Sequence, residues 1–401
     1  MKTRTSFQVL FTGIVFLVAA AAVSSAQTLR TLYSFSGSDG RDPVAGLKQA
    51  NDGNFYGTTY KGGANSLGTV FKITANGTLT TLHSFNGSDG SYLYASLVQG
   101  SDGNLYGTTG GGGARGAGTV FKITTEGTLT TLYSFCPLFI CTDGQSPFGW
   151  LVEGSDGNFY GTTNLGGTTA QGTVFKITPQ GTLTTLYSFC SLANCADGQS
   201  PVAGLVQGSD GNFYGTTILG GTADEGVVFK ITPSGALTTL HSFDLYTDGG
   251  GPVGGLVQAN DGNFYGTTFY GGSGGSGEGT VFKITASGTL TTLHVFAWGD
   301  GANPEAGLVQ ALDGNLYGTT SQGGVHCGPT GCGTVFKITL GGTLTTLHSF
   351  NGDDGQGPYA PLTPSVDRNF YGTTTAGGAN QDGSIFRLVI PRACILCPSA
   401  D

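Results

Sequence analysis

Eight cysteines are the residues whose type and spacing point most directly to covalent chemistry. Residues 1–26 have the features of an export signal, and an exported chain with an even number of cysteines favours disulfides over thiolate metal ligands. Six of them form Cys-x4-Cys motifs in unusually long loops: Cys136 with Cys141, Cys190 with Cys195, and Cys327 with Cys332. We expect each disulfide to form within its own motif. The alternative pairing joins adjacent repeats, Cys136 to Cys190 and Cys141 to Cys195. Cys394 and Cys397 have redox-motif spacing but no strand-to-helix context, so we expect a disulfide in the C-terminal tail.

Histidine and aspartate, the usual acid–base and metal-binding residues, occur mostly at repeated positions. His326 adjoins Cys327, but this set lacks the four ligands of a structural zinc site. Fourteen aspartates recur at turn positions, thirteen of them in Asp-Gly pairs, and none belongs to a calcium-loop pattern. We therefore expect no metal site and no cofactor. The other histidines share one position with tyrosines, so we interpret them as packing aromatics: His83, His241, His294 and His348, against Tyr33, Tyr133 and Tyr187.

Two departures from the repeat indicate a ligand or a reaction. Trp150 stands where four other repeats have glycine, and Glu153 stands where five other repeats have glutamine. A tryptophan can stack on a ligand ring, and a carboxylate can act as a general acid or base. Trp150 is therefore a candidate binding residue, and Glu153 is the one catalytic carboxylate that the sequence nominates. No Gly-x-Ser-x-Gly nucleophile motif accompanies them.

A repeated element must position these residues. The stretch Asp-Gly-Asn-Phe-Tyr-Gly-Thr-Thr first occurs at 52–59. Asp-Gly predicts a tight turn, and the aromatic and β-branched residues that follow predict a strand. The glycine of that strand occurs in all seven copies, and we expect it to let neighbouring sheets pack closely. The other copies begin at Asp102, Asp156, Asp210, Asp261, Asp313 and Asp367.

Four short strands in each unit, repeated seven times without helical periodicity, predict an all-β fold. The innermost of these strands is expected over apolar segments such as 203–207. The expected architecture is a seven-bladed β-propeller of four-stranded blades. After the expected signal, the repeats start with a lone outermost-type strand at 28–35, and the last unit has only three strands. We therefore expect the N-terminal strand to complete the last blade and close the ring. The alternative architecture is a linear β-solenoid, which needs no such split.

The combined motifs carry a family resemblance. Asp-Gly-Asn-Phe-Tyr-Gly-Thr-Thr, Gly-Thr-Val-Phe-Lys-Ile-Thr and Thr-Leu-Thr-Thr-Leu resemble the GloVer tandem repeat of secreted bacterial "choice-of-anchor" proteins over residues 28–390. That resemblance implies export and a propeller-like repeat, with no reaction attached. The Gly-Gly doublets are more distantly similar to kelch propellers, although leucine replaces the usual kelch tryptophan. The Asp-Gly-Asn strand also resembles streptogramin-lyase propellers, but the histidine and acidic residues of those enzymes have no matching pair here.

The expected segments are a signal peptide at 1–26, a seven-repeat domain at 27–390 and a Cys-containing tail at 391–401. Lys2 and Arg4, an apolar run and a small-residue cleavage site predict the signal, and a retained membrane helix is the alternative. We expect no membrane span after signal cleavage and a secreted or extracytoplasmic location, at the cell surface or in the periplasm. The formal net charge of −9 becomes −11 without those two basic residues, and no basic cluster offsets it. Nucleic acid is therefore not an expected partner.

Only two classes of loop vary in length, and in a propeller both emerge on the same face. Variable loops on a rigid scaffold are typical of binding sites, and aromatic rings there can stack on sugars or anchor a protein; several could instead cap the core. The sequence predicts a secreted, non-catalytic binding module for an unknown extracellular ligand, either carbohydrate or protein. The alternatives are a propeller enzyme of lyase or glycan-cleaving type and a purely structural envelope protein. The candidate ligand-binding residues are Tyr94, Phe148, Trp150, Glu153, Trp298 and Tyr359, and the same rim carries Tyr92, Phe139, Phe269 and Tyr270.

Overall fold

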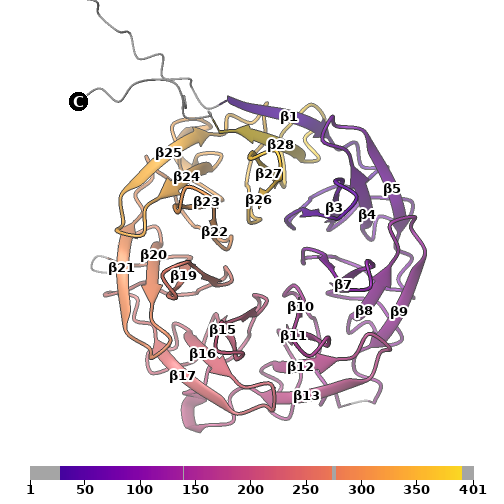
Figure 1. The fold of residues 1–401 in the computed structure, drawn as a ribbon, viewed down its shortest axis with the longest axis vertical. Helices are drawn as coiled ribbons and strands as arrows, with labels where there is room; N and C mark the ends of the chain where they lie inside the picture. Colours follow the sequence, from indigo (N-terminus) through magenta and orange to yellow (C-terminus); the bar gives the residue numbers. More distant parts are fainter. Residues whose placement is uncertain (1–27, 139, 273–276, 391–401) are drawn as a thin grey trace, which may run out of the picture.

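The computed structural model describes residues 28–138, 140–272 and 277–390. Seven four-stranded antiparallel sheets form a ring around a central channel (Figure 1). The predicted seven-bladed β-propeller is confirmed. The predicted signal peptide and C-terminal tail, with Cys394 and Cys397, lie outside the described residues.

The blades follow one another along the chain, and within blades 1 to 6 the chain passes from the innermost to the outermost strand. Blade 1 contains β2 (Lys48–Gln49), β3 (Phe55–Thr59), β4 (Thr69–Ile73) and β5 (Leu79–Ser84). Blade 2 contains β6 (Val98–Gln99), β7 (Leu105–Thr109), β8 (Thr119–Ile123) and β9 (Leu129–Ser134). Blade 3 contains β10 (Val152–Glu153), β11 (Phe159–Thr163), β12 (Thr173–Ile177) and β13 (Leu183–Ser188). Blade 4 contains β14 (Val206–Gln207), β15 (Phe213–Thr217), β16 (Val227–Ile231) and β17 (Leu237–Ser242).

The remaining three blades repeat the pattern until the ring closes. Blade 5 contains β18 (Val257–Gln258), β19 (Phe264–Thr268), β20 (Thr280–Ile284) and β21 (Leu290–Val295). Blade 6 contains β22 (Val309–Gln310), β23 (Leu316–Thr320), β24 (Thr334–Ile338) and β25 (Leu344–Ser349). Blade 7 contains β26 (Thr363–Pro364), β27 (Phe370–Thr374), β28 (Ser384–Val389) and β1 (Thr28–Ser34). Two short 3-10 helices, η1 (Ala193–Cys195) and η3 (Gly328–Thr330), lie in loops.

Ring closure follows the expected split of the last blade. The N-terminal strand β1 pairs antiparallel with β28, from Thr28 opposite Val389 to Ser34 opposite Ser384. Strand β1 thus covers the edge that β28 would otherwise expose. Both ends of the described chain therefore belong to one blade (Figure 1).

The core lies between the blades and is built from the repeated aromatic residues. The tyrosine of one second strand packs on the phenylalanine that begins the next: the centroids of the Tyr160 and Phe213 rings are 4.0 Å apart. In the third strands, the valine, phenylalanine and isoleucine are buried and the intervening lysine is partly exposed. Each blade therefore buries its faces against its two neighbours, as repeat proteins must.

The repeated glycine of the second strand has a different role from the one expected. A Cβ atom at Gly57 would lie 2.5 Å from Cζ of Phe71 and 2.8 Å from Cδ2 of Leu47. Both residues belong to the same blade as Gly57. The glycine therefore makes room for the phenylalanine of its own sheet, and the expectation that it serves close packing between sheets is wrong.

The innermost strands are also shorter than expected, with two residues each. The sequence predicted a strand over 203–207 in blade 4, but only Val206 and Gln207 pair with β15. Upstream of them, the carbonyl of Ala203 accepts a hydrogen bond from the Thr162 hydroxyl of the preceding blade, at 2.8 Å. The first half of each inner segment thus bonds to its neighbour rather than to its own sheet.

No helix in the described part of the chain is long and apolar enough to cross a membrane.

Candidate functional site

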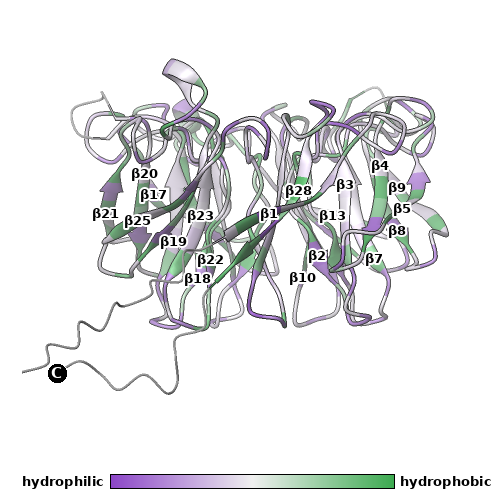
Figure 2. Cartoon of the chain, turned by 90° about the horizontal axis from the view of Figure 1, so that it is seen from above, coloured by the Kyte–Doolittle hydropathy of each residue, from purple (hydrophilic) through white to green (hydrophobic). Residues whose placement is uncertain are grey.

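The two faces of the ring differ, as the side view of Figure 2 shows. One face, here called the turn face, carries the short Asp-Gly-Asn turns. The opposite face, here called the loop face, carries the loops that follow each outermost strand and those that join the second and third strands. The innermost segments run from the loop face to the turn face, so their first residues surround the channel mouth on the loop face.

Seven side chains at one repeat position encircle that mouth, four residues before β2 and its equivalents. They line a cavity of about 370 Å³, here called the upper cavity. Six of the seven are valines or aromatic residues, and the seventh is a glutamate. The seven are Val44, Tyr94, Phe148, Val202, Val253, Glu305 and Tyr359.

Trp150 forms the floor of this cavity. Its repeat position follows that of the seven mouth residues by two, so it lies nearer the turn face. Glycine occupies this position in blades 4 and 5. A Cβ atom on Gly204 would lie 2.5 Å from Cδ2 of Trp150, and one on Gly255 would lie 2.2 Å from its Cη2. The indole therefore extends over the backbone of the next two blades, where any side chain would collide with it. This contact explains why glycine is needed at both positions.

An aromatic wall rises from this floor on the side of blades 2 and 3. The ring centroids of Tyr94 and Phe148 are 4.4 Å apart, and those of Tyr94 and Tyr60 are 4.7 Å apart. Tyr94 remains 37% exposed, so part of its ring faces the cavity. Burial and a hydrogen bond with Tyr60 raise the pKa of Tyr94. Tyr94 is thus neutral at ordinary pH and presents both an apolar face and a hydroxyl.

Glu305 lies on the opposite side of the upper cavity. It belongs to blade 6, which is three places from both blade 2 and blade 3 in the ring. Burial raises the pKa of Glu305 to about 7, although a hydrogen bond with Ser321 lowers it. Burial and the negative charge of Glu305 raise the pKa of Tyr359, the next residue around the mouth. The site thus pairs an aromatic wall with a carboxyl group that gains or loses its proton near neutral pH.

Sequence reasoning missed Glu305 and nominated Glu153 as the channel carboxylate. The Glu153 side chain accepts hydrogen bonds from the backbone N–H and the hydroxyl of Ser101, with Oε2 3.0 Å and Oε1 2.6 Å away. Glutamines make the same bridge at other interfaces, as when Oε1 of Gln207 accepts from the backbone N–H of Ser155 at 3.0 Å. Glu153 thus joins blade 3 to blade 2 near the turn face, and it does not line the upper cavity.

The remaining rim aromatics that the structure describes do not line the upper cavity, although Tyr92 contacts the Tyr60 ring beside the aromatic wall, with the ring centroids 5.2 Å apart. Trp298 is 40% exposed in the loop after β21 and lines neither channel cavity, so the structure does not bring it together with Tyr94, Phe148, Trp150 and Tyr359. Tyr270 packs against Gly250 and Gly251 in the outer part of blade 5. Phe139 lies outside the described residues.

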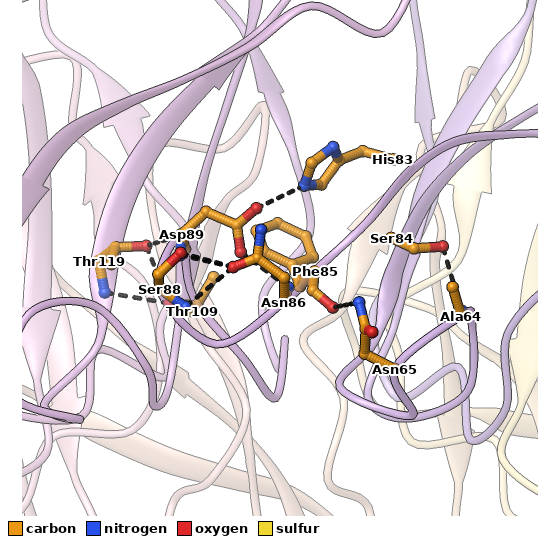
Figure 3. Close-up of polar contacts among 10 residues, drawn as sticks. All are labelled: Ala64, Asn65, His83, Ser84, Phe85, Asn86, Ser88, Asp89, Thr109 and Thr119. Carbon is orange, nitrogen blue, oxygen red and sulfur yellow. Dashed lines mark hydrogen bonds and ion pairs between the residues drawn. The ribbon is translucent and has the colours of Figure 1, made fainter.

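The repeated histidines and tyrosines of the outermost strands bind loop aspartates. Nε2 of His83 lies 2.9 Å from Oδ2 of Asp89, and Oδ1 of Asp89 accepts the backbone N–H of Asn86 at 2.9 Å (Figure 3). Tyr133 donates its hydroxyl to Asp143 at 2.9 Å in the same way. Each aspartate thus holds the start of a loop on the loop face. This arrangement gives these histidines a structural role at the strand ends.

Three disulfides staple the long loops, and each lies within its own Cys-x4-Cys motif rather than between blades. They join Cys136 to Cys141, Cys190 to Cys195, and Cys327 to Cys332. His326 therefore has no free thiolate beside it. Among the described residues, no cluster of three or more His, Cys, Asp or Glu side chains is arranged to hold a metal ion.

Fold and site together define a closed seven-bladed β-propeller with an aromatic-lined channel mouth. The Gloeobacter/Verrucomicrobia repeat matches residues 11–138, 138–330 and 313–393, and the chain belongs to this repeat family. The match confirms the resemblance to the GloVer repeat. No curated protein matches the chain in sequence.

Solved structures that resemble the chain include other propellers. Virginiamycin B lyase from Staphylococcus aureus is 18% identical, with a TM-score of 0.62, over 91% of this chain and 100% of its own. The extracellular domain of BT3049 from B. thetaiotaomicron is 14% identical, with a TM-score of 0.57, over 90% of this chain and 41% of its own. The extracellular domain of BT4673 from the same organism is 11% identical, with a TM-score of 0.59, over 90% and 39%. At these identities the likeness shows the fold alone.

Proposed function

We propose that this protein is a secreted, non-catalytic β-propeller that binds an extracellular ligand in the upper cavity. The observation that carries the proposal is the aromatic wall of Tyr94 and Phe148 above the Trp150 floor, across the channel from Glu305 and Tyr359. A concave, mostly apolar cavity with a few converging polar groups is the usual form of a ligand site. Its volume of about 370 Å³ suits a small ligand or one end of a longer one.

Carbohydrate is the ligand class that this chemistry favours. Sugar rings present C–H faces that pack on aromatic side chains, and their hydroxyls need hydrogen-bonding partners. Here the hydroxyls of Tyr94 and Tyr359 and the Glu305 carboxyl supply such partners around one apolar surface. A protein ligand, which could anchor a side chain in the same cavity, is the other class to be tested.

Two observations support an extracytoplasmic location. The described part of the chain has three disulfides. Disulfides persist in oxidising compartments and are rare in cytosolic proteins. Two of the structural relatives are extracellular domains. Both agree with the predicted signal at 1–26.

The test is a binding screen of the purified protein against glycan and protein panels, followed by variants. Tyr94→Ala and Phe148→Ala should each weaken the binding found by tenfold or more, because each removes part of the aromatic wall. Trp298→Ala is the matched control, since it removes an exposed loop-face aromatic outside the cavity and should leave the affinity unchanged. Loss of binding in the Trp298 variant, with retention in folded wall variants, would move the site out of the channel. No ligand in either panel would favour a structural envelope protein.

Glu305 supports a second candidate function. A carboxyl with a pKa near 7 is the kind of group that acts as a general acid, and a lyase or glycan-cleaving propeller needs such a group. Glutamine at this position keeps the shape but cannot transfer a proton. Turnover of a polysaccharide or macrocyclic lactone panel that Glu305→Gln abolishes, with Glu153→Gln active, would establish the enzyme and overturn the non-catalytic proposal.

A further inference from the structure

The channel contains a second cavity on the turn-face side of Trp150. This lower cavity has a volume of about 460 Å³ and is lined by the two-residue innermost strands and the residues just before them. The upper and lower cavities share Ser96, Trp150 and Pro361, which all occupy the repeat position of the floor. The floor therefore separates the two cavities, and the lower one faces the turn face.

The walls of the lower cavity are mostly apolar. Leucines and valines from six blades contribute to them, and the indole of Trp150 closes the inner end. The leucines are at most 5% exposed because they also pack in the core, so the valines and the indole present the open apolar surface. The polar lining is confined to a few side chains. The apolar lining residues include Leu97, Val98, Val152, Leu205, Val206 and Leu256.

One charged side chain interrupts these walls. Lys48 stands at the position where the other blades have valine or threonine, and no other charged residue in the described part of the chain lines the cavity. Lys48 makes no ion pair with any described residue, whereas Lys61, on the loop face, pairs with Asp42 at 3.6 Å. A cation in an apolar wall without a counter-ion favours an anionic ligand, because an anion supplies the missing charge.

The order of groups along the channel orients such a ligand. Lys48 is two residues closer to the turn face than the floor, while Trp150 lies at the inner end. A ligand that enters from the turn face therefore meets Lys48 and the valines at one level, and the indole of Trp150 beyond them. That order fits an amphiphile with its charged head outward and its chain inward.

The turn face does not prevent an anion from approaching. The acidic groups nearest the opening on this face are the repeated aspartates and Glu153, whose carboxylate accepts two hydrogen bonds from Ser101. Oδ2 of Asp52 accepts hydrogen bonds from the Asn54 side chain and the Tyr56 hydroxyl, each at 2.8 Å. Burial raises the pKa of Asp52, but the bonds from Asn54 and Tyr56 and the nearby Lys72 lower it by more. The negative charge of each such aspartate is thus already compensated within its own blade.

We propose that the lower cavity is a second binding site, which takes a small amphiphilic monocarboxylate with its carboxylate at Lys48 and its acyl chain against the valines and Trp150. Apolar burial of the chain supplies most of the affinity. Lys48 supplies the preference for a carboxylate head.

Tryptophan fluorescence provides the test, because the chain has only two tryptophans. In a Trp298→Phe background the emission comes from Trp150 alone. We expect octanoate to change this emission saturably and to bind at least tenfold more tightly than octanol, with octylamine weaker still. Lys48→Met should weaken octanoate binding at least tenfold and remove the preference over octanol, whereas Lys48→Arg should keep it.

Two controls locate the effect. Lys61→Met removes the same charge from the loop face, and Glu305→Gln changes the upper cavity; both should leave octanoate binding unchanged. Should Lys48→Met not fold, Val206→Glu provides the alternative, since a carboxylate in the wall of the same cavity should abolish octanoate binding. No saturable change with octanoate, or equal binding of octanoate by the Lys48 and Val206 variants and the parent, would overturn the proposal.

Discussion

At the scale of single residues, Glu305 shows how a rigid ring can hold a titratable group in an apolar setting. Burial at the channel mouth disfavours the carboxylate form, and the bond with Ser321 offsets only part of that cost. Below pH 7 the group is mainly a neutral acid that can donate a hydrogen bond, and above pH 7 it is mainly a carboxylate that accepts. Ligand binding at this mouth is therefore expected to change between pH 6 and 8.

The same burial predicts that the stability of the folded protein depends on pH. The folded pKa of about 7 lies above the ordinary value of 4.5, so the folded state holds more protons between these two values. Stability must then fall as the pH rises through this window, by about 3 kcal/mol at most, since each pH unit of difference corresponds to about 1.4 kcal/mol. Glu305→Gln removes that loss. The variant should gain stability relative to the parent between pH 5 and pH 8, measured by urea unfolding.

A matched control for this experiment is Glu153→Gln. Glutamine already makes the equivalent bridge at other interfaces, so this variant should show the parent's pH dependence. Identical pH profiles for the parent and Glu305→Gln would show that Glu305 is ionised in the folded protein throughout this range.

The site could be predicted from the sequence only in part. Trp150 stands out because it replaces glycine, and Tyr94, Phe148 and Tyr359 stand out as unrepeated aromatics. Glu305 escaped notice because one carboxylate after a proline resembles ordinary surface variation. The seven repeats can be aligned on the proline position that precedes it. The residue that follows this position then differs between repeats, and that difference is the signal that could have found Glu305. Its burial depends on the neighbouring blades, which a single repeat does not reveal.

At the scale of elements, the Asp-Gly-Asn turn is a hydrogen-bonded unit that each blade repeats. Asp210 accepts bonds from the Asn212 side chain at 2.7 Å and the Tyr214 hydroxyl at 2.8 Å. It also accepts the backbone N–H of Asn212 at 3.1 Å. Burial raises the pKa of Asp210, but the bonds from Asn212 and Tyr214 lower it by more, so the net change is downward. The turn thus fixes the tyrosine that packs on Phe264 of the next blade.

We expect Asp210→Ala to destabilise the protein by about 2–3 kcal/mol, because it leaves a partly buried tyrosine hydroxyl and an amide without their acceptor. Tyr214→Phe removes one of these bonds but keeps the ring contact with Phe264, so it should cost only about 1 kcal/mol. Urea unfolding of both variants measures the difference. Equal costs would mean that the aspartate acts only through the tyrosine hydroxyl.

Most elements follow from local sequence, because turn residues and β-branched runs recur in phase in every unit. The innermost strands were overestimated because their pairing is not a local property. Thr162 of one blade donates its hydroxyl to the carbonyl of Ala203 in the next blade, and a pattern within one unit does not encode this hydrogen bond. The role of Gly57 was misjudged for the same reason: the ring that fills its space comes from a different strand, β4.

At the scale of the whole molecule, the interface that closes the ring has the same contacts as the others. Thr373 donates to the carbonyl of Ala45 at 3.0 Å, and Oε1 of Gln49 accepts the backbone N–H of Val366 at 3.1 Å. The ring centroids of Phe55 and Tyr371 are 4.1 Å apart. What differs is that β1 reaches blade 7 from the other end of the chain. Closure therefore depends on one strand that non-covalent contacts hold in its blade, because the chain does not connect it directly to the other three strands.

Deletion of β1 should test this dependence. Loss of Thr28–Ser34 would remove its hydrogen-bonded ladder with β28 and expose the edge of that strand, at a cost on the order of 5 kcal/mol if each net hydrogen bond contributes about 1 kcal/mol. We expect a lower melting temperature, broader unfolding and concentration-dependent association through the exposed edge. A synthetic peptide of residues 27–36 added in trans should restore the melting temperature, because an extended peptide can add to a free sheet edge, whereas a scrambled peptide should not. An unchanged melting temperature and a monomeric elution profile after the deletion would show that six complete blades and three strands hold the ring without the N-terminal strand.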